Sequence, residues 1–73
     1  MARSFSGRRL RKTRKAAGVS VERLALSIGR TSYSIHEYEL GRVTPPINVL
    51  AAIADIIGSS VDDLLDEEEA HAA

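Results

Sequence analysis

The sequence predicts an all-α fold in which five short helices form one compact domain. Apolar residues recur at helical spacing in several short segments, and no segment shows the apolar–polar alternation of an amphipathic strand. Four of the five glycines directly follow such segments, where glycine commonly ends a helix. A chain of 73 residues can bury one small core, so we expect a single domain without a long linker.

The first helix is expected from about Ser6 to Ala17, and Gly18 ends it. Its inward stripe consists of Leu10, Arg14 and Ala17, which follow one another at spacings of four and three residues. An arginine on an apolar stripe needs a partner, because burying an unpaired charge is costly.

The second and third helices are short and are joined by a tight turn. Ser20 is expected to cap the second helix and Thr31 the third, since a side-chain oxygen there accepts a hydrogen bond from the first amides. Gly29 permits the positive φ of the turn between them, and Gly41 ends the third helix. The inward positions have helical spacing: Val21, Leu24, Ala25 and Ile28, followed by Ile35 and Tyr38. Two helices joined in this way predict a helix-turn-helix motif.

Two further helices are expected after the loop at residues 42–46. The first, about Pro46 to Ile57, ends at Gly58 and buries Ile47, Leu50, Ile53, Ala54 and Ile57. Ser60 and Asp63 have capping-box spacing and begin a last helix through Val61, Leu64 and Leu65. The acidic residues beyond it have nothing to bury. We therefore expect a domain at residues 1–66 and a disordered acidic tail at residues 67–73.

The formal net charge of zero conceals a segregation of charge along the chain. Residues 1–30 hold nine lysines and arginines and one acidic residue, whereas residues 43–73 hold seven acidic residues and no lysine or arginine. This asymmetry predicts a basic surface for an anionic partner, with the acidic remainder turned away. The alternative is that the two charged segments partly neutralise each other.

Several classes of function find no support in the composition. The chain has no cysteine, so it can form neither a disulfide nor a thiolate metal site. His36 and His71 lack metal-ligand spacing, and the dispersed glycines form no phosphate-binding loop. No apolar run approaches the ~20 residues of a membrane-spanning helix. We expect a cytoplasmic protein that is not an enzyme, has no catalytic residues, metal or cofactor, and does not bind membranes.

Three segments, LRKTRKAAGVS, LALSIGRTSYSIHEYELGR and PPINVLAAIADIIGSSVDDLL, make the sequence resemble the Cro/repressor-type (XRE-like) helix-turn-helix DNA-binding family. They cover residues 10–65 in the family's order and with its loop lengths. The resemblance implies a repressor-like five-helix fold whose third helix enters the major groove of double-stranded DNA. It also implies a sequence-specific transcriptional regulator, by default a repressor, that binds a palindromic operator as a homodimer.

The family's base-reading positions match Ser32, Tyr33 and Glu37 on the outward side of the third helix. A carboxylate can accept a hydrogen bond from cytosine N4, and a tyrosine ring can contact a thymine methyl group. For Glu37 the alternative is that it positions a neighbouring arginine. His36 lies at the edge of this surface and is either a further reader or an exposed bystander.

Phosphate contacts supply most of the affinity for DNA without selecting sequence. The expected phosphate ligands are exposed cations and two helix caps: Ser20, Arg23, Arg30, Thr31, Arg42 and Arg11. The remaining cations of the first helix are further candidates (Arg8, Arg9, Lys12 and Lys15), although a helix can turn only part of its circumference to one duplex.

The resemblance further implies a partly buried ion pair between Arg14 and Glu39. Glu39 lies four residues after Ile35 and so shares its inward side. The alternative is that Glu39 is solvated. At Val21 the sequence departs from the family, many of whose members have a glutamine that contacts DNA.

A protein-interaction module is the alternative function, for example one that docks a toxin or a sigma factor. Leu26 and Ile56 fall off the inward stripes of their helices. Together with Val61, Leu64 and Leu65 they could form a homodimer contact or bind another protein, unless they are buried within the monomer.

Overall fold

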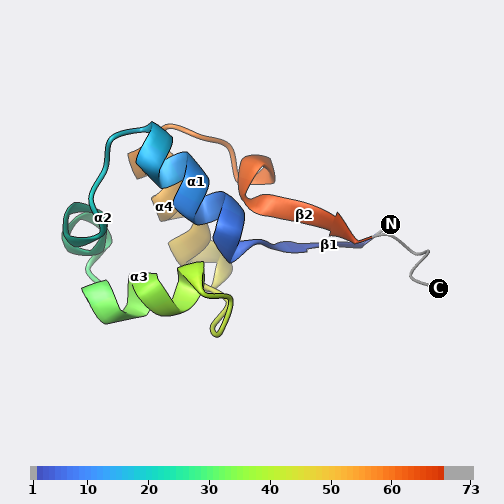
Figure 1. The fold of residues 1–73 in the computed structure, drawn as a ribbon, viewed down its shortest axis with the longest axis horizontal. Coiled ribbons are helices and arrows are strands. Elements are labelled where there is room, and N and C mark those ends of the chain that lie inside the picture. The colour runs from blue at the N-terminus through green and yellow to red at the C-terminus, as the bar shows by residue number, and fades with distance from the viewer. Residues whose placement is uncertain (1, 69–73) are drawn as a thin grey trace.

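The computed structural model describes residues 2–68 (Figure 1). Four helices, α1 (Gly7–Ala16), α2 (Val21–Ile28), α3 (Ser32–Glu39) and α4 (Ile47–Ile57), form its body, and one 3-10 turn follows at η1 (Asp62–Leu64). Two short strands, β1 (Ala2–Phe5) and β2 (Leu65–Glu68), pair antiparallel and project from the helices as a ribbon (Figure 1). None of the helices within residues 2–68 has the length and apolar character needed to cross a bilayer.

The first three helices begin at serine or threonine caps, and the sequence predicts two of these caps, Ser20 and Thr31. The hydroxyl oxygens of these caps accept main-chain hydrogen bonds of 3.0–3.1 Å: Ser6 from Arg9, Ser20 from Arg23 and Thr31 from Ser34. Gly29 and Gly58 end α2 and α4 with φ of 70° and 71°, a conformation that side chains disfavour. Local sequence therefore fixes the short turn between α2 and α3.

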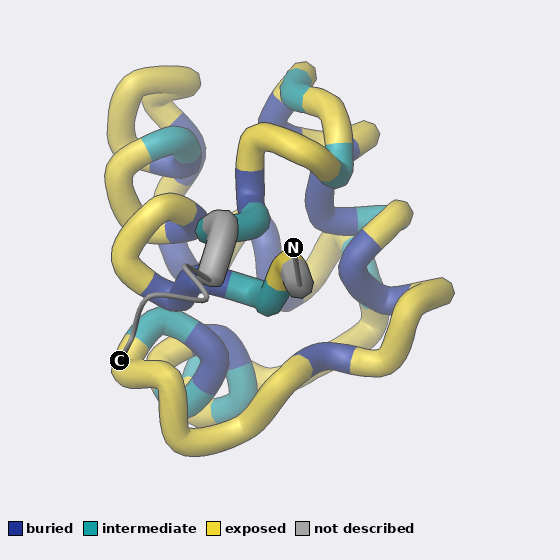
Figure 2. Tube along the Cα trace, turned by 90° about the vertical axis from the view of Figure 1, so that its right-hand side faces the viewer, coloured by how far each residue is buried: buried dark blue, intermediate teal, exposed yellow. Residues whose placement is uncertain are grey.

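The core lies where the four helices meet, with the buried positions on their inward sides (Figure 2). Each helix and η1 contributes one completely buried large side chain: Leu10, Leu24, Ile35, Ile53 and Leu64. Their contacts hold α3 against α1 and α2 while its opposite side faces solvent.

The predicted fifth helix is wrong, because this segment forms only one 3-10 turn. The capping contacts between Ser60 and Asp63 do form, each with a nitrogen–oxygen distance of 3.2 Å. Beyond Leu64 the chain becomes extended, since Leu65 pairs with Phe5 across the ribbon instead of continuing a helix. The fold is therefore four helices with a small two-stranded sheet, and not five helices.

The ribbon also crosses the predicted domain boundary. β2 continues through Glu68, so residues 67 and 68 belong to a strand and do not begin the predicted tail. The rest of that tail, including His71, lies outside the described residues.

Two predicted inward positions, Ala17 and Ile47, are exposed. Ala17 caps the C-terminal end of α1, where the chain turns away at Gly18, and Val19 is buried nearby instead. Ile47 is the first residue of α4. At 100° per residue, its side chain points about 90° around the helix axis from the centre of the buried stripe, and it is therefore exposed. Val49 is the additional buried residue on this helix.

Candidate nucleic-acid interface

An ion pair between Arg14 and Glu39 joins α1 to α3, as the resemblance implied. Arg14 Nε lies 2.6 Å from Glu39 Oε2, and Nη2 lies 3.3 Å from Oε1. Both side chains are less than a tenth exposed, and Arg14 Nη1 also donates to the carbonyl of Val19 at 2.8 Å. The pair neutralises one of the two glutamates of α3 inside the domain and sets the position of this helix.

Gly7 brings the beginning of α1 against the end of α3. A Cβ atom at Gly7 would lie 2.5 Å from the carbonyl oxygen of Glu39 and closer still to that of Tyr38. Because both atoms belong to the backbone, only glycine fits without a shift of one helix. The sequence analysis did not single out Gly7. Alanine forms helices better than glycine, so a glycine in the first turn of a helix can indicate that another backbone lies close to it.

Three of the four predicted base readers lie on one outward surface of α3. Tyr33 is 72% exposed, His36 is exposed, and Ser32 is half-buried at the first position of the helix. Residues at these spacings lie within about 100° of one another around the helix axis. The surface therefore presents a hydroxyl, a phenol ring and an imidazole side by side.

Glu37, the fourth predicted reader, is sheltered by the chain that follows α3. Its side chain is only 14% exposed, and its Oε2 lies 3.3 Å from Arg42 Nη1. The main-chain N–H groups of Arg42 and Val43 both donate to the carbonyl oxygen of Glu37, at 3.0 and 3.4 Å. This geometry supports the alternative role, in which Glu37 positions Arg42.

A shallow hollow lies between α3 and this loop. Its lining consists of Tyr33, Ser34, Glu37 and Tyr38 from the helix and Val43 from the loop. Ser34, Tyr38 and Val43 were not among the predicted site residues. Val43 reaches the hollow because the loop folds back against α3. A loop has no periodic pattern, so the sequence could not predict this position.

The predicted phosphate ligands flank α3 at both ends. Arg30 and Thr31 precede the helix, Arg42 follows it, and all three are exposed. Arg23 and Arg11 are exposed on α2 and α1. Ser20 and Thr31 occupy the N-terminal ends of α2 and α3, where the first amides have no partner within the helix and can bind an anionic oxygen.

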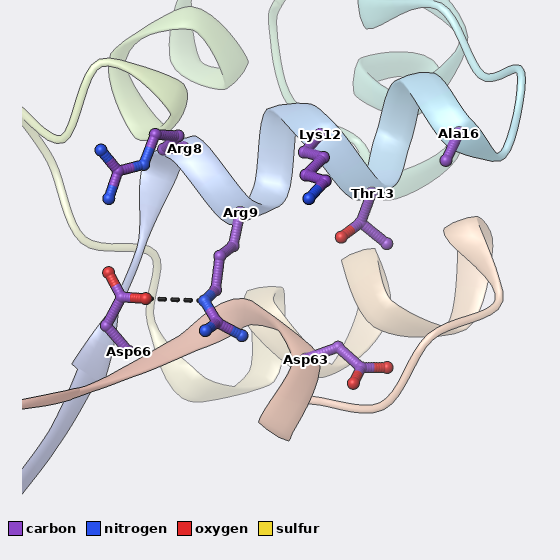
Figure 3. A pocket seen from close by; sticks show the side chains of 7 residues that line it. All are labelled: Arg8, Arg9, Lys12, Thr13, Ala16, Asp63 and Asp66. Atoms are coloured by element: carbon purple, nitrogen blue, oxygen red, sulfur yellow. Dashed lines mark hydrogen bonds and ion pairs between the residues drawn. The ribbon is translucent and has the colours of Figure 1, made fainter.

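Part of the basic cluster of α1 faces the acidic C-terminal segment instead (Figure 3). Arg9 Nε lies 2.6 Å from Asp66 Oδ1. Arg3, on the neighbouring strand β1, pairs with the same segment, with Nη1 3.2 Å from Asp62 Oδ1. A hollow of about 620 Å³ on this side has a lining of mixed charge: Arg8, Arg9, Lys12, Thr13, Ala16, Asp63 and Asp66. The expectation that the acidic remainder is turned away from the basic part is wrong here, because the two segments partly neutralise each other.

The structure decides between the alternatives that the sequence left open for several apolar residues. Val21 is 8% exposed and belongs to the core, which explains why an apolar residue stands there. Leu26 and Ile56 are 83% and 40% exposed, so neither is buried within the monomer. The apolar residues near the C-terminal end pack in or against the core, namely Val61, Leu64 and Leu65.

A family model described as a helix-turn-helix domain matches residues 7–67, and therefore all four helices. The chain belongs to this family.

The domain is similar to transcriptional regulators over most of its length. The prophage-derived HTH-type transcriptional regulator YonR of Bacillus subtilis is 37% identical over 59 residues, which cover 81% of this chain and 55% of YonR. The clp gene regulator ClgR from Corynebacterium glutamicum superposes with a TM-score of 0.76 at 31% identity, over 80% of this chain and 62% of ClgR. SinR, in its complex with SinI, gives a TM-score of 0.74 at 32% identity, over 84% of this chain and 60% of the SinR chain. The helix-turn-helix domain thus spans little more than half of these proteins.

The same fold also forms part of an enzyme. Hydroxypropylphosphonic acid epoxidase from S. wedmorenis superposes with a TM-score of 0.76 at 23% identity, over 82% of this chain but only 32% of the epoxidase. A similarity at this level concerns the fold alone. Function must therefore be argued from the surface around α3.

Proposed function

We propose that this helix-turn-helix domain is a sequence-specific DNA-binding transcriptional regulator. The observation that carries the proposal is the surroundings of α3, where an exposed face with Ser32, Tyr33 and His36 lies between exposed arginines at the two ends of the helix. The major groove of B-DNA admits an α-helix, and hydroxyl, imidazole and aromatic side chains can contact base edges there.

An acidic helix can approach a polyanion because its charges are compensated. α3 contains two glutamates and no lysine or arginine. Arg14 neutralises Glu39 in the interior, and Arg42 pairs with Glu37 at the surface. The exposed cations Arg30 and Arg42 then supply attraction to phosphates on either side of the reading face.

Dimeric binding to a palindromic operator is the simplest arrangement for a domain of this size. Two copies related by a two-fold axis would place their α3 helices about 34 Å apart on one face of the duplex. Occupation of a promoter by this dimer would repress transcription without a ligand or cofactor. The similarity to YonR and ClgR, which are named as regulators, supports regulation of transcription as the role.

A protein-interaction module is the second candidate, and the exposure of Leu26 favours it. This leucine is 83% exposed on α2, where an isolated domain gains nothing from an apolar side chain. SinR, a similar structure, is solved in complex with another protein, SinI. A partner of this kind would use a surface other than the outward face of α3.

Selection of bound duplexes from a random pool tests the proposal. We expect an enriched consensus with two inverted half-sites whose centres are one helical turn apart. Tyr33→Ala should broaden that consensus, while Asp55→Ala, a change at an exposed position on α4, should leave it unchanged. No enrichment at low salt would contradict DNA binding, and a consensus without inverted symmetry would contradict the dimer.

A further inference from the structure

We propose that the hollow beside α3 is a subsite for one cytosine and that it favours cytosine with a methyl group at C5. This inference rests on the proposed DNA binding and deepens it. The hollow combines a fixed carboxylate with apolar walls, and it lies on the side of α3 where Tyr33 is exposed: Tyr33, Ser34, Glu37, Tyr38 and Val43 line it.

The carboxylate of Glu37 is oriented before DNA arrives. Arg42 holds Oε2 at 3.3 Å, and only 14% of the side chain is exposed. The loop is in turn fixed by two main-chain hydrogen bonds to the carbonyl oxygen of Glu37. A carboxylate offers about four lone-pair sites, so Glu37 can keep Arg42 on one oxygen and accept from a base on the other.

A carboxylate beside an apolar wall matches one base edge better than the others. In the major groove only cytosine and adenine present an amino donor. Adenine places the N7 acceptor next to its amino group, and that acceptor would be repelled by the carboxylate. Cytosine places the nonpolar C5 position next to N4, where the hollow offers an apolar wall. Thymine has a C5 methyl group but presents the O4 acceptor to Glu37.

The apolar wall has a further consequence for a methylated base. Val43 is 47% exposed and Tyr33 is 72% exposed, so both present apolar surface to solvent when the domain is free. A C5 methyl group placed against them would remove this surface from water. The expected gain is about fourfold in affinity, which corresponds to about 0.8 kcal/mol for one buried methyl group.

Two parallel selections from random duplex pools test the subsite, one pool with cytosine and one with 5-methylcytosine throughout. Each cytosine of the selected duplex is then methylated singly, and the affinity is measured by fluorescence anisotropy. We expect one cytosine position per half-site at which methylation strengthens binding about fourfold. Thymine at that position, which has the methyl group but lacks the amino donor, should bind more weakly than either form of cytosine.

Variants of Val43 assign the effect to the hollow. Val43→Ala and Val43→Thr should remove the gain from methylation, measured within each variant as the ratio of its affinities for the methylated and unmethylated duplexes. Ile47→Ala is the matched control, because Ile47 is an exposed apolar residue outside the lining of the hollow, and it should keep the gain.

Three results are decisive. Methylation that is neutral or weakening at every cytosine would overturn the subsite, and so would a gain that persists in both Val43 variants. Failure to select any duplex from either pool would instead contradict the proposed function itself.

Discussion

Arg14 and Glu39 meet inside the domain through two contacts of 2.6 and 3.3 Å, although 24 residues separate them in the sequence. The pair joins the helix that carries most of the basic residues to the helix that carries the candidate base readers. Because both side chains are almost fully buried, each charge depends on the other for compensation. The orientation of α3 is therefore linked to the integrity of this contact.

Glu39→Gln should lower the free energy of unfolding by about 3–5 kcal/mol, because it leaves the buried guanidinium of Arg14 without a counter-charge. Urea denaturation followed by circular dichroism measures the change. Asp62→Ala is the control, since it breaks an exposed ion pair with Arg3 and should cost no more than about 1 kcal/mol. Equal losses for the two variants would show that the buried pair has no special role.

Gly7→Ala should destabilise the domain by about 1–3 kcal/mol, because the added methyl group meets the backbone of α3. Helix propensity alone predicts the opposite sign, with alanine better than glycine by about 1 kcal/mol. Thermal unfolding decides between these signs, and Lys12→Ala at an exposed position of α1 serves as the reference. A stabilised Gly7→Ala variant would mean that α1 and α3 are not in close contact there.

The four helices could be predicted from the sequence because their signals are local. Ser6, Ser20 and Thr31 each cap a helix through a contact three residues along the chain, and Gly29 ends α2 through its own conformation. The apolar spacing then determines which side of each helix is buried. Arg14 could be predicted as buried for the same reason, since it falls on such a stripe.

The ribbon could not be predicted, because its two strands pair residues about 60 positions apart. The register joins Arg3 to Glu67 and Phe5 to Leu65. Each strand has only four residues, and acidic residues such as those of β2 are depleted in strands. The sheltering of Glu37 was missed for a similar reason: it depends on a loop that folds back over α3, and a helical pattern says nothing about that loop.

Arg42→Ala should weaken binding to every operator sequence, because its expected partner is a phosphate. It should also reduce discrimination at the position that Glu37 reads, because Arg42 holds that carboxylate in place. The slope of log K against log salt should fall by about one for each Arg42 that contacts DNA. Arg3→Ala is a matched loss of one positive charge from the ribbon and should leave the slope unchanged. An unaltered slope in Arg42→Ala would argue against a phosphate contact at this residue.

Glu37→Gln separates base reading from the positioning of Arg42. If the carboxylate reads cytosine, the glutamine amide can also donate to thymine O4, and discrimination at one operator position should fall by about 1–3 kcal/mol. Parallel selection with the wild type and the variant measures this change, with Asp55→Asn as the control on α4. A variant that keeps the whole consensus and loses affinity uniformly would leave Glu37 with the positioning role alone.

The salt dependence of duplex binding tests the central claim most directly. Four exposed arginines per protomer are expected to contact phosphates, namely Arg11, Arg23, Arg30 and Arg42. Each contact contributes about −0.9 to the slope of log K against log salt, so a dimer that uses all of them should give a slope of about −7. Titration of the selected duplex between low and physiological salt measures this slope. A flat dependence, or no binding at low salt, would contradict the assignment of the α3 surface to DNA and would favour a protein partner.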